Sequence, residues 1–185
     1  MHKNLPGNSG LTLMELMIAI AIIGILTAIA VPNIISWLPN YRLKAAARDL
    51  YSNMQETKLQ AVKSNSDRAI VFDLANNKYC VYSDKGDDNS WSGTADNTIV
   101  KTCLLHNGIA YGHGNATNNA TIEGGSFPDD EVSYDPNRVV FNSRGLCNSG
   151  YVYIQNSYNN TFGIGSLSSG AIRLRKWDSA SANWN

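Results

Sequence analysis

The side chains able to do nucleophilic or acid–base chemistry are few in this 185-residue chain. His106 and His113 follow Cys103 within a segment that also contains glycine, and this spacing matches no known nucleophile and base pair. The GxSxG, HExxH and P-loop sequences are also missing. The sequence therefore predicts no catalytic residue, no cofactor and no enzyme.

The three cysteines allow a disulfide but not a zinc site. Cys80, Cys103 and Cys147 lie far apart and have neither CxxC nor Cys/His metal spacing. In an oxidising compartment two of them could form one disulfide, and the sequence does not choose among the three pairings. The alternative is that all three are small buried apolar side chains.

Charge is balanced overall but unevenly placed. The formal net charge is zero, yet residues 84–135 hold nine acidic and two basic side chains, and residues 136–185 hold five basic and one acidic. Asp84, Asp87 and Asp88 could collect calcium, but no glutamate follows at the EF-hand spacing. We therefore expect a solvated acidic loop and no metal site.

Arg173, Arg175 and Lys176 lie together on a predicted strand next to Trp177. Because side chains alternate along a strand, the two arginines should point to the same face. They could bind phosphates while the tryptophan stacks on a base, which makes DNA a candidate partner. The sequence favours the alternative that these charges keep an edge strand soluble.

Glu15 is the one acidic or basic side chain between Lys3 and Arg42. The 21 residues from Leu16 to Ser36 hold no charge, which is enough to cross a hydrocarbon core of ~30 Å as a helix. A carboxylate there is costly unless it is paired or near the interface. Glu15 either uses the favourable field of the first helical turn or pairs with the N-terminal amine of another subunit.

Residues 1–10 have the character of a leader peptide. They are polar, carry Lys3 and end in Ser9-Gly10, immediately before the apolar run. An ordinary secretory signal is cleaved after its apolar run, whereas here the junction itself is the expected processing point. Lys3 should stay cytoplasmic, so that everything after Trp37 is exported.

This N-terminal segment resembles the processing and methylation motif of type IV prepilins and type II secretion pseudopilins. The likeness is carried by the stretch GLTLMELM from Gly10, then AIAIIGIL from Ala19 and AVPN from Ala30. It implies that a prepilin peptidase cuts after Gly10, that Leu11 becomes the methylated N-terminus and that Glu15 neutralises a neighbour's amine during assembly. Leu11 departs from the family, which usually has phenylalanine there.

The stalk helix should continue beyond the membrane. Apolar or small residues from Leu43 to Ala61 recur in steps of three and four, which predicts one packing face on a helix from about Thr12 to Lys63. Pro32 and Pro39 should bend or locally melt it.

After Asn65 the pattern changes to that of strands, beginning with a hairpin. The predicted strands are 68–73, 78–83, 98–104, 108–111, 138–141, 150–155, 161–165 and 171–177, with a loop over 84–97. The fold class is therefore α+β, with a long N-terminal helix packed on an antiparallel β-rich head. The expected divisions are leader 1–10, membrane half 11–40, amphipathic half 41–66 and head 67–185.

The head is similar to that of GspH/FimT-like minor pilins and pseudopilins. VVFNSRG from Val139, GIG from Gly163 and GAIRLR from Gly170 carry this likeness, although two residues separate Gly170 from the first arginine, where the family often joins them. It implies a minor pilin or pseudopilin that assembles with other pilins through its helix. The alternatives are a DNA-uptake pilin, a major pilin and, more remotely, a membrane-anchored enzyme.

The resemblance also implies partners and a location. The expected partners are a prepilin peptidase, an inner-membrane assembly platform, membrane lipid and, for the DNA-uptake alternative, DNA. The expected location is the bacterial inner membrane, spanned once with the N-terminus cytoplasmic and the head outside, and then the pilus or pseudopilus.

Overall fold

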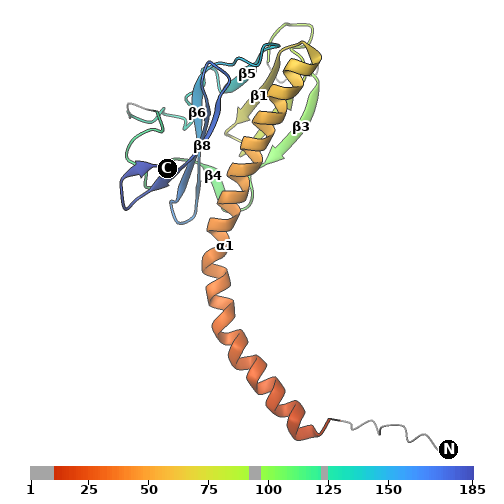
Figure 1. Ribbon diagram of the computed structural model, residues 1–185, viewed down its shortest axis with the longest axis vertical. Helices are drawn as coiled ribbons and strands as arrows, with labels where there is room; N and C mark the ends of the chain where they lie inside the picture. Colours follow the sequence, from red (N-terminus) through yellow and green to blue (C-terminus); the bar gives the residue numbers. More distant parts are fainter. Residues whose placement is uncertain (1–10, 92–96, 122–124) are drawn as a thin grey trace, which may run out of the picture. The chain divides into compact units, whose positions relative to one another are not determined.

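The computed structural model describes residues 11–91, 97–121 and 125–185 (Figure 1). Within these residues the chain forms one helix followed by strands in antiparallel sheets, so the predicted α+β fold class is confirmed. The elements are α1 (Leu13–Ser64), β1 (Arg68–Asp73), β2 (Lys78–Tyr82), β3 (Ile99–Leu104), β4 (Ile109–Tyr111), β5 (Arg138–Phe141), β6 (Gly150–Asn156), β7 (Thr161–Ser166), β8 (Ile172–Asp178) and β9 (Asn183–Trp184). Chain contacts divide it into two units between Leu38 and Pro39.

The first unit contains the apolar half of α1. Its large apolar side chains are exposed on every side of the helix, from Leu13 at 76% to Ile35 at 62%. The helix runs without interruption through Pro32 and Pro39, so the predicted local melting does not occur. A proline within a helix loses one backbone hydrogen bond, but the remaining turns on either side still hold it.

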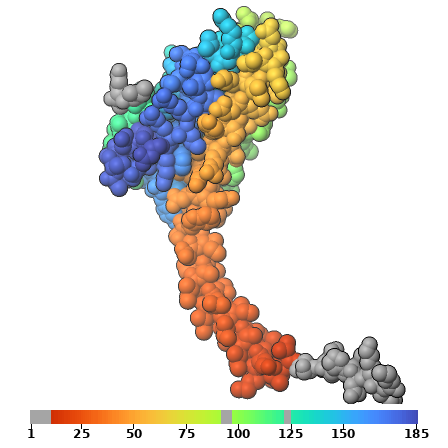
Figure 2. All heavy atoms as spheres, viewed as in Figure 1, coloured from red at the N-terminus to blue at the C-terminus, as the bar shows by residue number. Residues whose placement is uncertain are grey.

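The second unit contains the amphipathic half of α1 and all the strands. One face of this helical half is buried, at Leu43, Ala46, Ala47, Leu50, Asn53, Met54, Thr57 and Ala61. The steps of three and four predicted from the sequence are therefore confirmed. Figure 2 shows the other face of this half, in orange to yellow, open beside the blue strands of the head.

Two antiparallel sheets form the head. The strand order is β3-β2-β1-β5 in one and β4-β6-β7-β8-β9 in the other. The predicted hairpin of β1 and β2 is confirmed, with Asp73 opposite Lys78. Its link ends at Asn77, whose φ of 51° is in the left-handed region that asparagine tolerates. The short strand β9 was not predicted.

The described residues of the head form three apolar clusters, because both faces of each sheet carry buried apolar side chains. The main core joins the helix to the inner faces of both sheets through side chains such as Leu50, Ile70 and Ile154. A second cluster covers the outer face of the five-stranded sheet, with Tyr153 and Trp184 at its centre. The third covers the outer face of the other sheet.

A lysine of the helix also attaches to the turn between β7 and β8. Lys58 Nζ donates a hydrogen bond of 2.8 Å to the carbonyl oxygen of Gly170. Gly170 has a φ of +78°, and a Cβ there would collide with the carbonyl oxygen of Gly145. Only glycine fits this turn, which brings the β7–β8 hairpin against the helix.

Candidate functional site

Glu15 and Thr12 form a reciprocal cap at the start of α1. The Thr12 hydroxyl oxygen accepts from the backbone N–H of Glu15 at 3.2 Å, and the Glu15 carboxylate accepts from the Thr12 backbone N–H at 2.9 Å. The hydroxyl also donates to the same carboxylate oxygen at 3.0 Å. The sequence signal for this cap is local, the threonine–x–x–glutamate spacing of a capping box.

The remaining processing residues lie at or before the edge of the described chain. Gly10 and the leader, residues 1–10, lie outside the described residues. Leu11, the predicted mature terminus, is 82% exposed and precedes the cap by one residue. In the mature chain the amine of Leu11 would therefore lie one residue before Thr12 and four before Glu15.

The apolar half of α1 has the length and composition of a membrane span. Among the described residues this is the single helix that meets both criteria, and its most apolar window has no buried residue. A helix with apolar side chains exposed on all faces needs lipid or other apolar helices around it.

The three basic residues of the predicted cluster do not all lie on the same face of β8. Ile172 and Leu174 pack against the main core, so Arg173 and Arg175 project from the opposite, outer face of β8. Lys176 falls on the other side by the same alternation. The prediction that the two arginines share a face is confirmed, and Lys176 does not join them.

One other expectation about this strand is confirmed in part and one is wrong. β9 pairs with β8 only along Trp177 and Asp178, so no described strand lies on the second side of β8 from Ile172 to Arg175, where both arginines stand. Trp177 is not available to stack on a base, since it is 5% exposed and its ring lies 5.3 Å from that of Trp184. Its neighbours in the fold come from the last residues of the chain, which the sequence pattern does not connect to β8.

On the outer face of the sheet, each of the two arginines lies opposite a glycine of β7. Arg173 lies opposite Gly165 of β7, and Arg175 lies opposite Gly163. A Cβ on Gly165 would collide with the Tyr151 ring, so this glycine lets a tyrosine of β6 lie across β7. Arg173 therefore lines an open cleft of about 460 Å³ whose other walls include Tyr151 and the hydroxyl side chains Thr121, Ser133, Ser149 and Ser166.

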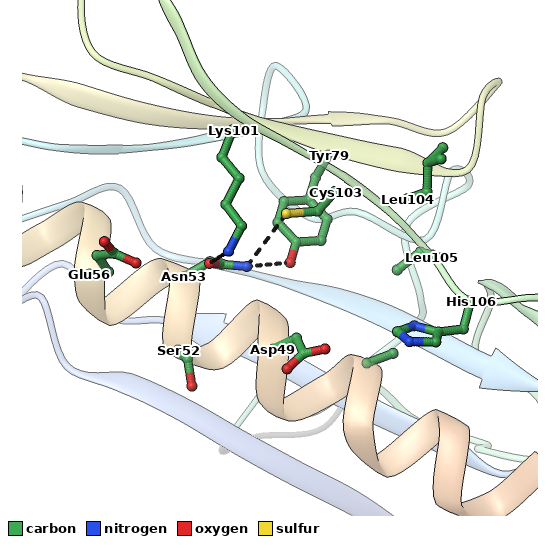
Figure 3. A pocket seen from close by; sticks show the side chains of 11 residues that line it. Asp49, Ser52, Asn53, Glu56, Tyr79, Lys101, Cys103, Leu104, Leu105 and His106 are labelled. Carbon is green, nitrogen blue, oxygen red and sulfur yellow. Dashed lines mark hydrogen bonds between the residues drawn. The ribbon is translucent and has the colours of Figure 1, made fainter.

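A second cavity, of about 490 Å³, lies between α1 and β3 (Figure 3). At its base Asn53 accepts a hydrogen bond from Lys101 Nζ at 2.8 Å and donates one to the Tyr79 hydroxyl at 2.6 Å. Burial raises the pKa of Tyr79 well above its usual value, so the phenol stays neutral. Asp49 and Glu56 line the helical side of the same cavity.

Two regions of the sequence match known families. Residues 5–31 match the prokaryotic N-terminal methylation motif, and residues 46–181 match the family described as type II transport protein GspH. The second match spans most of the chain, including every strand from β1 to β8. The chain belongs to the GspH family. It is a structural subunit of the minor pilin or pseudopilin class.

Two solved structures align with this GspH-family chain. The type IV minor pilin FimU of Pseudomonas aeruginosa aligns with a TM-score of 0.50 at 10% identity, over 79% of this chain and 94% of FimU. The minor pseudopilin EpsH from the type 2 secretion system of Vibrio cholerae aligns at 0.49 and 14% identity, over 72% of this chain and 95% of EpsH. No curated protein sequence matches.

The cysteines of this GspH-family head are separate free thiols, so none of the three allowed disulfides is formed in the structure. Cys80 lies 3.6 Å from the Thr102 hydroxyl, Cys103 lies 3.7 Å from the Asn53 amide nitrogen, and Cys147 donates to the Leu167 carbonyl at 3.2 Å. Burial raises the pKa of the Cys147 thiol. The three thiols have different partners. Cys80 is buried, whereas Cys103 and Cys147 are half-buried, so the alternative of three small buried side chains holds fully for Cys80 alone.

In the acidic loop of the head, backbone N–H groups of the loop bind the carboxylate of Asp84. Asp84 accepts hydrogen bonds from the N–H groups of Gly86 and Thr98 at 3.1 and 3.2 Å and from the Ser83 hydroxyl. These bonds, with Thr98 foremost, lower the pKa of the Asp84 carboxyl. Across the described residues, no group of three metal-ligating side chains comes together.

One acid–base pair in the GspH head was not predicted. His113 Nδ1 lies 2.7 Å from the Glu131 carboxylate, and the imidazole stacks on Phe127 with ring centres 4.0 Å apart. Eighteen residues separate the pair in sequence, so no local spacing indicated it. It joins two loops and brings no nucleophile with it.

Proposed function

We propose that this GspH-family subunit is made as a prepilin, is cut after Gly10 and then carries a methylated amine on Leu11. The match to the N-terminal methylation motif over residues 5–31 supports this maturation. Cleavage at this point replaces a polar leader by a single positive terminus at the start of the apolar helix. The partner for this step is a prepilin peptidase.

Glu15 pairs with the N-terminal amine of a neighbouring subunit during assembly. The observation that supports this role is the position of its carboxylate, in the first turn of a helix whose most apolar window has no buried residue. In the single chain Thr12 supplies its hydrogen bonds. An incoming ammonium forms a charge-assisted bond, which is about twice as strong as a neutral one, and can replace them.

The apolar half of α1 holds the subunit in the inner membrane before assembly. Lys3 keeps the N-terminus cytoplasmic and the head on the far side, and lipid surrounds the helix until other pilin helices replace it. An assembly platform in the same membrane delivers the subunit to the filament. The filament is a type IV pilus or a type II secretion pseudopilus.

The test compares Glu15→Ala with Arg48→Ala, which changes an exposed residue on the head half of the same helix. Glu15→Ala should insert and lose its leader normally, yet its incorporation into filaments should fall at least about tenfold, the effect of roughly 1.4 kcal/mol. Arg48→Ala should behave as wild type. Mass spectrometry of the mature N-terminus and filament fractionation measure the two steps. Normal incorporation of Glu15→Ala would refute the role, and an intact Met1 terminus would refute the maturation.

DNA binding is a second candidate function, favoured by the outer face of β8. There two guanidinium groups lie beside glycines, and Arg173 opens onto a cleft lined by Tyr151 and hydroxyl groups. Phosphates would meet the arginines, and an unpaired base would stack on the tyrosine.

The division of the basic cluster supplies a matched control for this candidate. Replacing Arg173 and Arg175 by glutamate should weaken DNA binding by at least about tenfold and reduce its salt dependence. Lys176→Glu makes a charge change of the same kind on the other face and should have little effect. Fluorescence anisotropy with a labelled oligonucleotide measures both, and equal effects of the two changes would exclude this cleft.

A further inference from the structure

The strand β3 has a free edge. It pairs with β2 on one side, and no other described strand lies on its second side. Leu105 N–H donates to the carbonyl of Asn77 at 3.0 Å, and the register places Cys103 opposite Tyr79. Hydrogen bonding alternates along an antiparallel pair, so Thr102 and Leu104 turn their backbone groups away from β2.

The side chains of β3 do not protect this edge from pairing. Ile99, Val100 and Leu104 are 49%, 57% and 70% exposed. A lysine on an edge strand usually prevents strand addition by keeping its charge in solvent. The one charged residue of β3 is Lys101, and its ammonium is directed inward to Asn53 instead. Lys101 is itself an exposed residue, but its hydrogen bond to Asn53 draws the ammonium toward α1, and the exposed apolar side chains lie on either side of it.

The cavity beside this edge adds a charge preference. Asp49 and Glu56 line it from α1, seven residues apart on the same helical face, and both side chains are exposed (Figure 3). Against them stands Lys101, whose ammonium is already bonded to Asn53. The excess carboxylate fits a cationic side chain from outside.

We propose that β3 is a docking edge, where an extended segment of a different pilin-type subunit adds as a further strand. Its backbone pairs with Thr102 and Leu104, its apolar side chains cover Val100 and Leu104, and its lysine or arginine enters the cavity beside Asp49 and Glu56. The class of partner rests on the proposed function. The edge and the cavity are features of the head alone.

A second copy of this chain does not meet these requirements. If two β3 edges paired, each strand would supply Lys101 as its cation, and that ammonium is already hydrogen-bonded to Asn53 of its own head. The two acidic cavities would then face each other without a counter-charge. The partner strand is therefore a different sequence that carries its own cation.

The first experiment is site-specific photo-crosslinking of the full chain in its native membrane. A photo-reactive residue at position 104 should form a product with another pilin-type subunit, identified by mass spectrometry. The same residue at Ser179, an exposed position of the β8–β9 turn, is the matched control and should form little product. No product from position 104, a product with a second copy, or a product with a protein of another class would overturn the proposal.

Two further variants test the backbone and charge requirements separately. Thr102→Pro removes an outward N–H and should abolish crosslinking from position 104, whereas Thr102→Ala keeps that N–H and should preserve it. Asp49→Lys combined with Glu56→Lys changes exposed residues and should reduce the product about tenfold, the effect of losing a desolvated ion pair. If Thr102→Pro fails to fold, the charge variant still decides. Unchanged crosslinking in the charge variant would contradict the assigned cavity.

The docking edge and the assembly role of Glu15 fail in different ways. Mass spectrometry of the same samples reports whether the leader has been removed, and filament fractions report incorporation through the helix. Normal maturation and incorporation without a crosslink from position 104 would reject the docking edge alone. Crosslinking from position 104 with normal incorporation of Glu15→Ala would reject the Glu15 role alone.

Discussion

The two halves of α1 use the same helical geometry for opposite purposes. From Leu13 to Ile35 the apolar side chains surround the helix and are exposed in the single chain. From Leu43 to Ala61 they form one buried stripe, and the polar residues cover the rest. The difference shows that the first half completes its packing only with lipid or other subunits, whereas the second half completes it within its own head.

The largest effect should come from truncating the same residue type in both halves. Leu50 is fully buried in the main core, whereas Leu26 is 62% exposed in the apolar half. Leu50→Ala should lower the free energy of unfolding of the head by about 2–5 kcal/mol because it leaves a cavity. Leu26→Ala should leave head stability unchanged. Denaturant unfolding of the full chain in detergent, followed by head tryptophan fluorescence, measures both, and equal losses would show that the halves are not independent.

The polar contact within the buried stripe should give the next largest effect. Asn53→Ala leaves the Tyr79 hydroxyl and the Lys101 ammonium without their hydrogen bonds to the amide. Lys101 is exposed and can turn to solvent, but Tyr79 is 2% exposed. An unsatisfied buried polar group costs about 1–3 kcal/mol, so the free energy of unfolding should fall by that amount. Ser52→Ala changes the neighbouring exposed position and is the control. A loss of the same size in Ser52→Ala would show that the amide contacts add nothing.

A smaller effect is expected at the other end of the helix. Thr12→Ala removes the hydroxyl that caps α1 and bonds the Glu15 carboxylate, at a cost of about 0.5–2 kcal/mol to the first turn. Amide hydrogen exchange in detergent should quicken near Glu15 while exchange in the β strands stays the same. Thr27→Ala, in the middle of the apolar half, should leave exchange near Glu15 unchanged. Slow exchange at Glu15 in Thr12→Ala would contradict the cap.

The smallest effect is expected in the pH dependence of unfolding at acidic pH, and it should be confined to the head. Because hydrogen bonds lower the pKa of Asp84 in the folded chain, its stabilisation is fully present above the unfolded pKa of about 3.9 and is lost as pH falls through the lower folded value. Asp84→Asn should therefore flatten the pH dependence of thermal unfolding below about pH 4. Asp87→Asn is the matched control. Identical pH profiles for Asp84→Asn and wild type would exclude this contribution.

Much of the fold followed from local pattern. The helix bounds were predicted to within a residue at each end, and the bounds of eight strands to within about one residue. These predictions succeeded because the spacing of apolar residues along the chain indicates the helical period of 3.6 and the strand period of 2. β9 was missed because two residues, Asn183 and Trp184, carry no period. Its pairing with the end of β8 buries Trp177, which reversed the expectation that this ring could stack on a base.

The contacts of the site residues are also of two kinds, those between residues close in sequence and those made by the folded sheet. The Thr12 and Glu15 cap lies within one helical turn, so the sequence contains it fully. The contact of Asn53 with Lys101 joins residues 48 apart, and that of Arg173 with the Tyr151 cleft depends on glycines in the strand between them. No spacing rule connects such residues, because sheet order and register bring them together.

The sequence by itself determined the apolar helix, its lone carboxylate and the strand content, since each depends on residues close together in the chain. It also determined the resemblance on which the GspH family assignment rests. Tertiary structure alone decided which strand edges stay open, which charges share a face and which cysteines stay apart. Those features depend on strand order, and strand order is set by how the whole head buries its apolar surface.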